Sequence, residues 1–350
     1  MLNRDQNQNV AEASTAIQAG GNVTVINSGL TYNEVRDITL NVFKANFYEL
    51  AKEAKEIAQS RAEEITEKFL LKLQEKHPIG FRKSNDPDFQ YALFEVQKEY
   101  AKTGDKELGD LLIDLLVDRS KQEQRNILQI VLNESLNTAP KLTENQLASL
   151  AIIFLFKYAQ WDSINHQMFA ECLDKFCKPF ASKIVKNLAC YQHLEFASCG
   201  TISFGKNMLE DIIETKYQGL FLKGFDKQDF SGSDLSIGLD KRFIIPCLNA
   251  PSKWQINVLN KTVLDNEFDK HQISLEARNK IEILFNYEKM NTLEIKEKCI
   301  ELRPYMSDVF DVWNNSSMKN FTLTSVGIAV AHANIKRLVG EFADLSIWIN

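Results

Sequence analysis

Hydrophobic residues recur at three- and four-residue steps along most of the chain, which is the spacing of one face of an α-helix. The longest such stripe runs over residues 31–80, and its middle positions are all alanine. It predicts one continuous amphipathic helix, which Pro78 and Gly80 end. A helix of that length suits a stalk or a dimer-forming element, and it equally suits packing along its own domain.

Shorter helical patterns separated by breakers predict a central helical domain over residues 81–217. Thr143 and Gln146 form a capping box ahead of a very apolar helix expected over 144–160. Short turns between the helices indicate an antiparallel array.

Asp110, Asp114 and Asp118 follow one another at four-residue steps on one side of a predicted helix. Paired carboxylates can hold a metal ion or share a proton. No histidine or second carboxylate motif accompanies them, and basic residues follow at once. We therefore expect a solvated acidic face.

Glycine and proline are densest over residues 218–252, which predicts an irregular connector or a small hairpin. Within it, 220–222 and 243–245 are short strand candidates.

Helical patterns return over residues 253–350, with helices expected from 253 to 265 and onward. Three helices followed by Leu-Thr-x-x-Gly at 323–327 resemble a winged-helix module. The candidate recognition helix carries Asp308 and Asp311 and no lysine or arginine, so the resemblance implies a protein-binding module rather than a DNA reader.

Composition supports this reading, because 14 glycines and 7 prolines in 350 residues are few breakers. The predicted fold class is mainly α, a multi-helix array with a long N-terminal helix, a C-terminal winged-helix-like module and minor β. The net charge of -6 argues against a nucleic-acid partner. No apolar run is long enough to span a membrane, and the first residues do not resemble a signal peptide. Six scattered cysteines indicate reduced thiols in a cytoplasmic protein.

Residues 1–30 differ from the rest and predict a disordered, β-prone interaction tail. No charged residue occurs from 13 to 33, and Val23, Val25 and Ile26 favour a strand. An uncharged β-prone segment without proline is typical of cross-β or strand-addition pairing. A tail without any such role is the alternative.

The sequence Ile-Gln-Ala-Gly at 17–20, followed by an asparagine and a β-prone stretch, resembles the prion-like tags of bacterial phage-defence and programmed-death proteins. Those tags are similar to the RIP homotypic interaction motif of animals, whose core is apolar-Gln-apolar-Gly. The resemblance implies an interaction site made by six residues: Ile17, Gln18, Gly20, Asn22, Val23 and Val25.

The body of the chain is similar to an uncharacterised bacterial helical family that is seen with such tags. The similarity rests on residues 29–36, 42–47, 105–110 and 323–327. It implies no activity and no catalytic residues.

Gly200, Gly205 and Lys206 match the G-x4-G-K pattern of a phosphate-binding loop. Asn207 stands where a hydroxyl residue would bind magnesium, and no strong strand precedes the motif. The motif leaves open a nucleotide-binding enzyme as an alternative to a simple strand-turn-helix.

The first hypothesis is a non-enzymatic interaction or oligomerisation protein of bacterial antiviral defence or stress signalling. Its partners would be a second copy of itself or an effector protein with a similar tag. A winged-helix DNA-binding regulator is a further alternative. Cys190 and His193 are the one pair with zinc-like spacing, and we expect neither a metal nor a cofactor.

Overall fold

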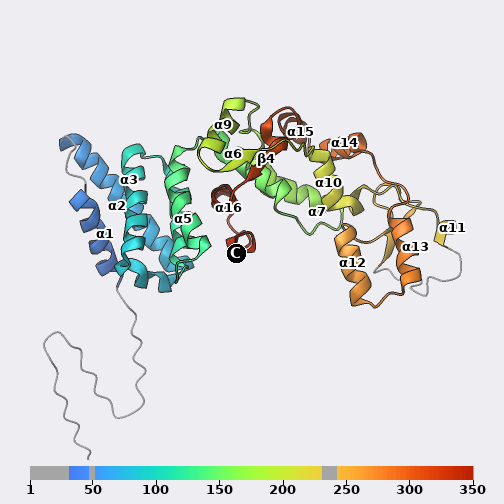
Figure 1. Cartoon of the computed structure of the whole chain (residues 1–350), viewed down its shortest axis with the longest axis horizontal. Helices are drawn as coiled ribbons and strands as arrows, with labels where there is room; N and C mark the ends of the chain where they lie inside the picture. The colour runs from blue at the N-terminus through green and yellow to red at the C-terminus, as the bar shows by residue number, and fades with distance from the viewer. Residues whose placement is uncertain (1–30, 47–51, 231–242, 350) are drawn as a thin grey trace, which may run out of the picture.

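The computed structural model describes residues 31–46, 52–230 and 243–349. Most of these residues are helical, and the strands among them form two small antiparallel pairs, so the mainly α class with minor β is confirmed. Figure 1 shows an elongated array with α1 (Tyr32–Asn46) at one end. Within the described ranges, none of the helices combines the length and hydrophobicity needed to cross a bilayer.

The prediction of one continuous helix over 31–80 is wrong, because the structure has two helices there that pack against each other. The second is α2 (Lys52–Lys76), and both helices also contact α3 (Pro87–Thr103). Ala62 of α2 is fully buried in a cluster with Phe43 of α1. The alanine face is therefore filled by helices of the same chain, which leaves no long free stalk.

The N-terminal half continues with the turn η1 (Pro78–Asn85), α4 (Lys106–Ser120), α5 (Ile127–Thr138), the turn η2 (Ala139–Lys141) and α6 (Glu144–Lys157). Polar caps set where these helices begin. The Asp105 carboxylate accepts bonds from the amides of Glu107 and Leu108, at 3.0 and 3.1 Å. Thr143 and Gln146 form the predicted capping box at the start of α6.

The elements that follow are α7 (His166–Cys172), the π-helical turn η3 (Leu173–Cys177), α8 (Lys178–Ala181), α9 (Leu188–Phe196), α10 (Leu209–Tyr217), the turn η4 (Gln218–Phe221), α11 (Lys227–Phe230), α14 (Thr292–Leu302), α15 (Met306–Asn314) and the turn η5 (Ser317–Asn320). Of these, α8, α9 and α10 pack against α6. Residues 148–156 of α6 are buried on every side, as expected of a helix that is apolar all round.

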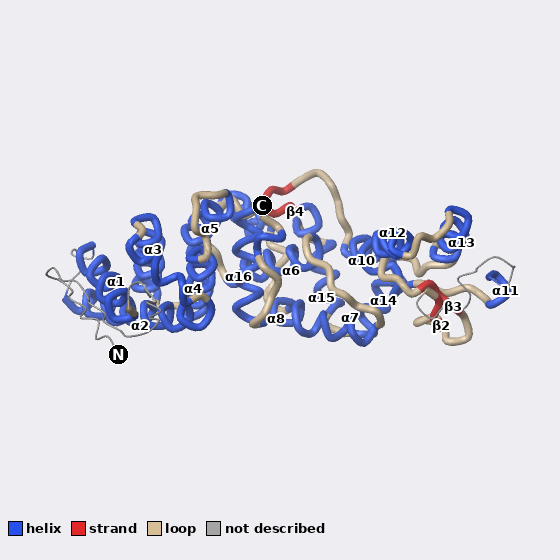
Figure 2. The backbone as a smooth tube through the Cα atoms, turned by 90° about the horizontal axis from the view of Figure 1, so that it is seen from below, coloured by secondary structure: helices blue, strands red, loops and turns tan. Residues whose placement is uncertain are grey.

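The last long helix, α16 (Ser325–Val339), returns to the middle of the molecule and packs against α4, α5 and α6. Both views show it between the two halves of the array (Figures 1 and 2). The chain then ends in the turn η6 (Leu345–Ile347), where the Trp348 indole N–H donates to the Tyr158 carbonyl at 2.9 Å. The C-terminal segment is therefore docked on the body.

Of the two strand pairs, one joins distant parts of the chain and the other joins two neighbouring strands. β1 (Gly200–Ile202) pairs with β4 (Phe321–Leu323), and β2 (Ile244–Pro246) pairs with β3 (Trp254–Ile256). A Cβ atom on Gly200 would lie only 2.2 Å from the Phe321 ring, so the first pairing requires glycine at that position.

Residues 253–350 do not come together as the separate winged-helix-like module that the sequence predicts. The strand β4, which would begin the wing, pairs with β1, and α16 lies in the centre of the body. The helix expected from residue 253 starts later, as α12 (Lys261–Lys270), because β3 occupies 254–256. With α13 (Leu275–Phe285) and the β2–β3 pair, α12 surrounds a small second core at the far end (Figure 1).

Three helices of the N-terminal half are joined through one carboxylate, that of Asp88 on α3. It accepts bonds from the buried Arg119 guanidinium of α4, and from Gln129 and Asn133 of α5 at 2.8 and 3.2 Å. Partial burial would raise the pKa of Asp88, but these donors outweigh burial and hold it below its usual value. The Arg119 side chain is 0% exposed, and Asp88 is the carboxylate that pairs with it.

Replacing Asp88 by alanine leaves a buried guanidinium without a carboxylate. Because the Asp88 side chain is itself 48% exposed, water can partly take its place, and we expect the free energy of unfolding to fall by about 1.5–3 kcal/mol. Urea unfolding followed by circular dichroism measures the change. Glu134→Ala, an exposed change on α5, is the matched control and should stay within about 0.5 kcal/mol. Equal unfolding midpoints for the two variants would contradict this role of Asp88.

Candidate functional site

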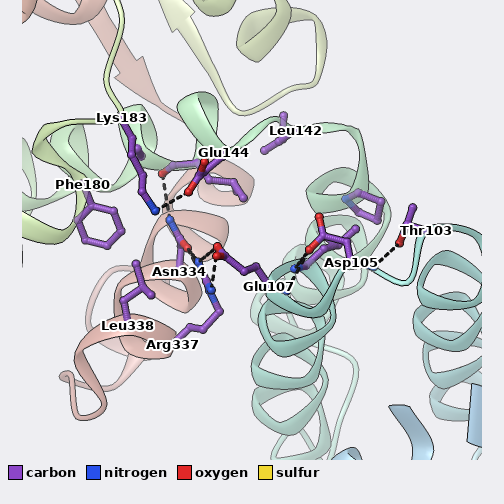
Figure 3. A pocket seen from close by; sticks show the side chains of 14 residues that line it. Thr103, Asp105, Glu107, Leu142, Glu144, Phe180, Lys183, Asn334, Arg337 and Leu338 are labelled. Carbon is purple, nitrogen blue, oxygen red and sulfur yellow. Dashed lines mark hydrogen bonds and ion pairs between the residues drawn. The ribbon is translucent and has the colours of Figure 1, made fainter. Parts of the chain in front are cut away.

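A pocket of about 400 Å³ lies where four parts of the fold meet. Its walls come from the turn between α3 and α4, the start of α6, the segment around α8, and the C-terminal half of α16 (Figure 3). These parts are distant in sequence, and α16 brings them together.

The polar side of the pocket centres on Arg337 of α16. Its Nη2 donates to Oδ1 of Asn334 at 3.0 Å, and Asn334 donates in turn to the Leu147 carbonyl at 3.2 Å. Figure 3 shows Glu107 reaching from α4 toward Arg337, with contacts of 3.4 and 3.5 Å to Oε2. The Arg337 side chain is only 10% exposed, whereas that of Glu107 is 62% exposed.

A second ion pair, between Lys183 and Glu144, lies on another side of the same pocket. Glu144 is in the first turn of α6, as Glu107 is in that of α4. Acidic residues are favoured in first turns because the helix dipole places partial positive charge there. Local helix formation therefore puts both carboxylates at the rim of the pocket.

The pocket also has an apolar side. It is formed by Leu108, Leu142, Leu147, Phe180 and Leu338. An apolar wall with a few convergent polar groups is typical of small-molecule sites.

Further along α4, away from the pocket, the helix carries two buried carboxylates, so the expected solvated face is wrong for Asp114 and Asp118. Asp114 is 2% exposed and pairs with Lys72 of α2 at 2.7 Å. Asp118 is almost as buried and pairs with Lys336 of α16 at 2.9 Å and with Lys121 at 2.7 Å. Lys121 follows Asp118 at the end of the same helix, but Lys72 and Lys336 come from other helices, which the spacing along α4 does not reveal.

The two carboxylates differ in acidity because they differ in partners. Burial raises the pKa of Asp114, and Lys72 only partly opposes it, since one carboxylate oxygen has no hydrogen-bond partner among the described residues. Burial acts in the same direction on Asp118, but Lys336 and Lys121 outweigh it and lower its pKa.

The predicted site residues lie in different places. Ile17, Gln18, Gly20, Asn22, Val23 and Val25 lie outside the described residues. Gly200 is in β1, whereas Gly205 and Lys206 are exposed in the loop that leads to α10.

Two amides of the loop are already bonded to backbone carbonyls of the same chain. The amides of Ser203 and Asn207 donate to the carbonyls of Asn320 and Lys319, at 2.9 and 3.2 Å. The loop is thus held against η5, and its geometry does not favour phosphate binding.

The cysteines and histidines do not form a site in the part of the chain that the structure describes. All six cysteines are free, and the described part of the chain brings together no group of three His, Cys, Asp or Glu residues suited to a metal. His332 is buried, its Nε2 lies 2.6 Å from the Ala343 carbonyl, and burial lowers its pKa. His332 is therefore a packed core histidine.

Sequence reasoning missed Arg337, Asn334 and Lys183 as a group. The signal was present on α16, where Asn334 and Arg337 stand three residues apart near the end of a largely apolar helix. Two polar residues on one face of a buried helix indicate that the face meets a polar partner or a cavity. Lys183 carries no comparable signal.

Fold and pocket together define a mainly helical array with a small-molecule-sized pocket at its centre. The chain belongs to an uncharacterised family, whose model matches residues 29–349. Neither a curated protein nor a solved structure matches the chain.

The opposite pKa shifts of the two aspartates predict opposite effects of pH. Stability from Asp118 is present above its unfolded pKa of about 3.9 and is lost as the pH falls through the lower folded value. Asp114 titrates above its unfolded value, so its contribution declines as the pH rises through the folded pKa. At neutral pH, Asp118→Asn should cost about 2 kcal/mol or more, and Asp114→Asn less than about 1 kcal/mol.

Thermal unfolding of both variants from acidic to neutral pH measures these contributions. Asp118→Asn should lose part of the acid sensitivity of the wild type, and Asp114→Asn should keep it. A larger loss at neutral pH for Asp114→Asn than for Asp118→Asn would contradict the assignment.

Proposed function

We propose that this protein is an interaction protein of bacterial defence or stress signalling, which assembles through the uncharged segment preceding α1. The observation that carries the proposal is the run from 13 to 33, which has no charge and contains a β-prone core. Segments of this kind pair edge to edge with a like segment. The partner is a second copy or an effector with a similar tag.

The placement of α1 supports this proposal. α1 lies at one end of the elongated body (Figure 1). The first residue that the structure describes, Thr31, directly precedes α1, so the uncharged segment joins the body at this end. A segment joined at that end can pair with another chain while the rest of the body stays accessible. Several tags held together raise the effective concentration of the attached bodies, so a weak strand contact becomes a stable assembly.

Two observations speak against the alternatives. The loop at 200–207 has two of its amides bonded to backbone carbonyls, which does not favour a nucleotide site. The candidate recognition helix, α15, buries Val309, Phe310 and Trp313 in the body, and its Asp311 pairs with Lys186 at 2.6 Å. Neither feature favours insertion into a DNA groove.

The proposal is tested by placing charges in the β-prone core. In the double variant Gln18→Asp/Val23→Asp, like charges stack in register in any paired assembly, so assembly should fall at least about tenfold. Sedimentation velocity and thioflavin fluorescence of the full chain measure the effect.

The matched control is Gln6→Asp/Asn9→Asp, which adds the same charge outside the β-prone core. It should assemble like the wild type. Unchanged assembly of the Gln18/Val23 variant would refute the proposal, and equal losses in both variants would show a general charge effect instead.

A further inference from the structure

We propose that the pocket between α4, α6 and α16 binds a small organic oxyanion, a molecule with an apolar body and one negatively charged head. The head takes the place of the Glu107 carboxylate on Arg337. This site is independent of the N-terminal segment, and its ligand is a small molecule rather than a protein.

The first argument is the contrast between the two charges of the Arg337–Glu107 pair. The guanidinium is nine-tenths buried and held in place by Asn334, whereas the carboxylate is 62% exposed. A good arginine–carboxylate pair has two parallel bonds of about 2.7–2.9 Å. Here both contacts go to one oxygen, at 3.4 and 3.5 Å. The buried cation is thus in place, and its present partner is loosely held and open to exchange.

The second argument is the position of the second ion pair. Lys183 faces the same pocket, and its partner Glu144 is 56% exposed, so its carboxylate also lies on the water side. Both side chains of the Lys183–Glu144 pair are partly exposed, so displacing Glu144 into water costs little. Glu107 is exchanged rather than lost, because the charged head of the ligand takes its place on Arg337. Both carboxylates lie at the rim, whereas the guanidinium lies inside the pocket. A ligand that fills the interior therefore needs a negative charge to pair with Arg337.

The third argument is size and lining. A volume of about 400 Å³ lies within the range of about 300–1,000 Å³ that is usual for small-molecule sites. Leu142, Phe180 and Leu338 line the pocket together with the charged groups and offer an apolar surface to the body of the ligand (Figure 3). A bare inorganic anion would leave this surface uncovered.

A matched pair of fluorescent probes tests the proposal on the full chain. Anilinonaphthalenesulfonate has an apolar ring body and one sulfonate, and phenylnaphthylamine has a closely similar body without the charge. We expect the sulfonate probe to bind saturably and at least about tenfold more tightly than the neutral one, the ratio that one charge-assisted bond supplies.

Two variants assign the binding to this pocket. Arg337→Gln should weaken the sulfonate probe about tenfold and leave the neutral probe unchanged. Glu107→Gln removes the competing carboxylate and should tighten the sulfonate probe a few-fold. Because Glu107 is exposed, its variant keeps the test decisive if Arg337→Gln fails to fold.

The matched control is Glu301→Gln, which removes an exposed carboxylate paired with Lys298 on α14 at 3.1 Å. It should bind both probes like the wild type. Equal binding of the two probes would overturn the proposal, as would sulfonate binding that neither the Arg337 nor the Glu107 variant changes. Equal tightening by Glu301→Gln and Glu107→Gln would show a net-charge effect and would also overturn it.

Discussion

The burial of α16 against α4, α5 and α6 is the constraint on which the rest of the structure depends. Nine successive residues of this helix, 327–335, are buried, so it acts as a core element rather than as a terminal appendage. Its last turns carry Lys336 and Arg337, which reach opposite ends of α4, at Asp118 and Glu107. One helix thereby fixes the central core, closes the pocket and neutralises a buried carboxylate.

This arrangement interlocks the two halves of the array. The strand before α16 pairs with β1, and a Cβ atom on Gly327 would lie 1.8 Å from the Cys199 carbonyl oxygen. The start of the helix is thus pressed against one half of the body, while its end is bonded to the other. The small core around α12 and α13 lies outside this interlock, at the far end of the molecule.

Local features of the fold could be predicted from sequence, and long-range ones could not. The capping box of Thr143 and Gln146 and the apolar run of α6 were both confirmed, because each depends on residues that are close together in the sequence. The prediction of one long helix failed because the hydrophobic periodicity continues from α1 to α2 and does not show where the chain reverses. Asp114 was misjudged for another reason: Lys72 comes from a different helix. Predicting the pocket would have required knowing that α16 lies beside α4, which the sequence does not show.

The position of α16 has a consequence for how the protein is made. A chain emerging from the ribosome exposes α4, α5 and α6 before the helix that covers them has been synthesised. Until residues 325–339 appear, their apolar faces are in contact with water or with chaperones, and Asp118 lacks Lys336. Synthesis of residues 325–339, rather than the formation of α4, α5 or α6, is therefore the event that lets the body close.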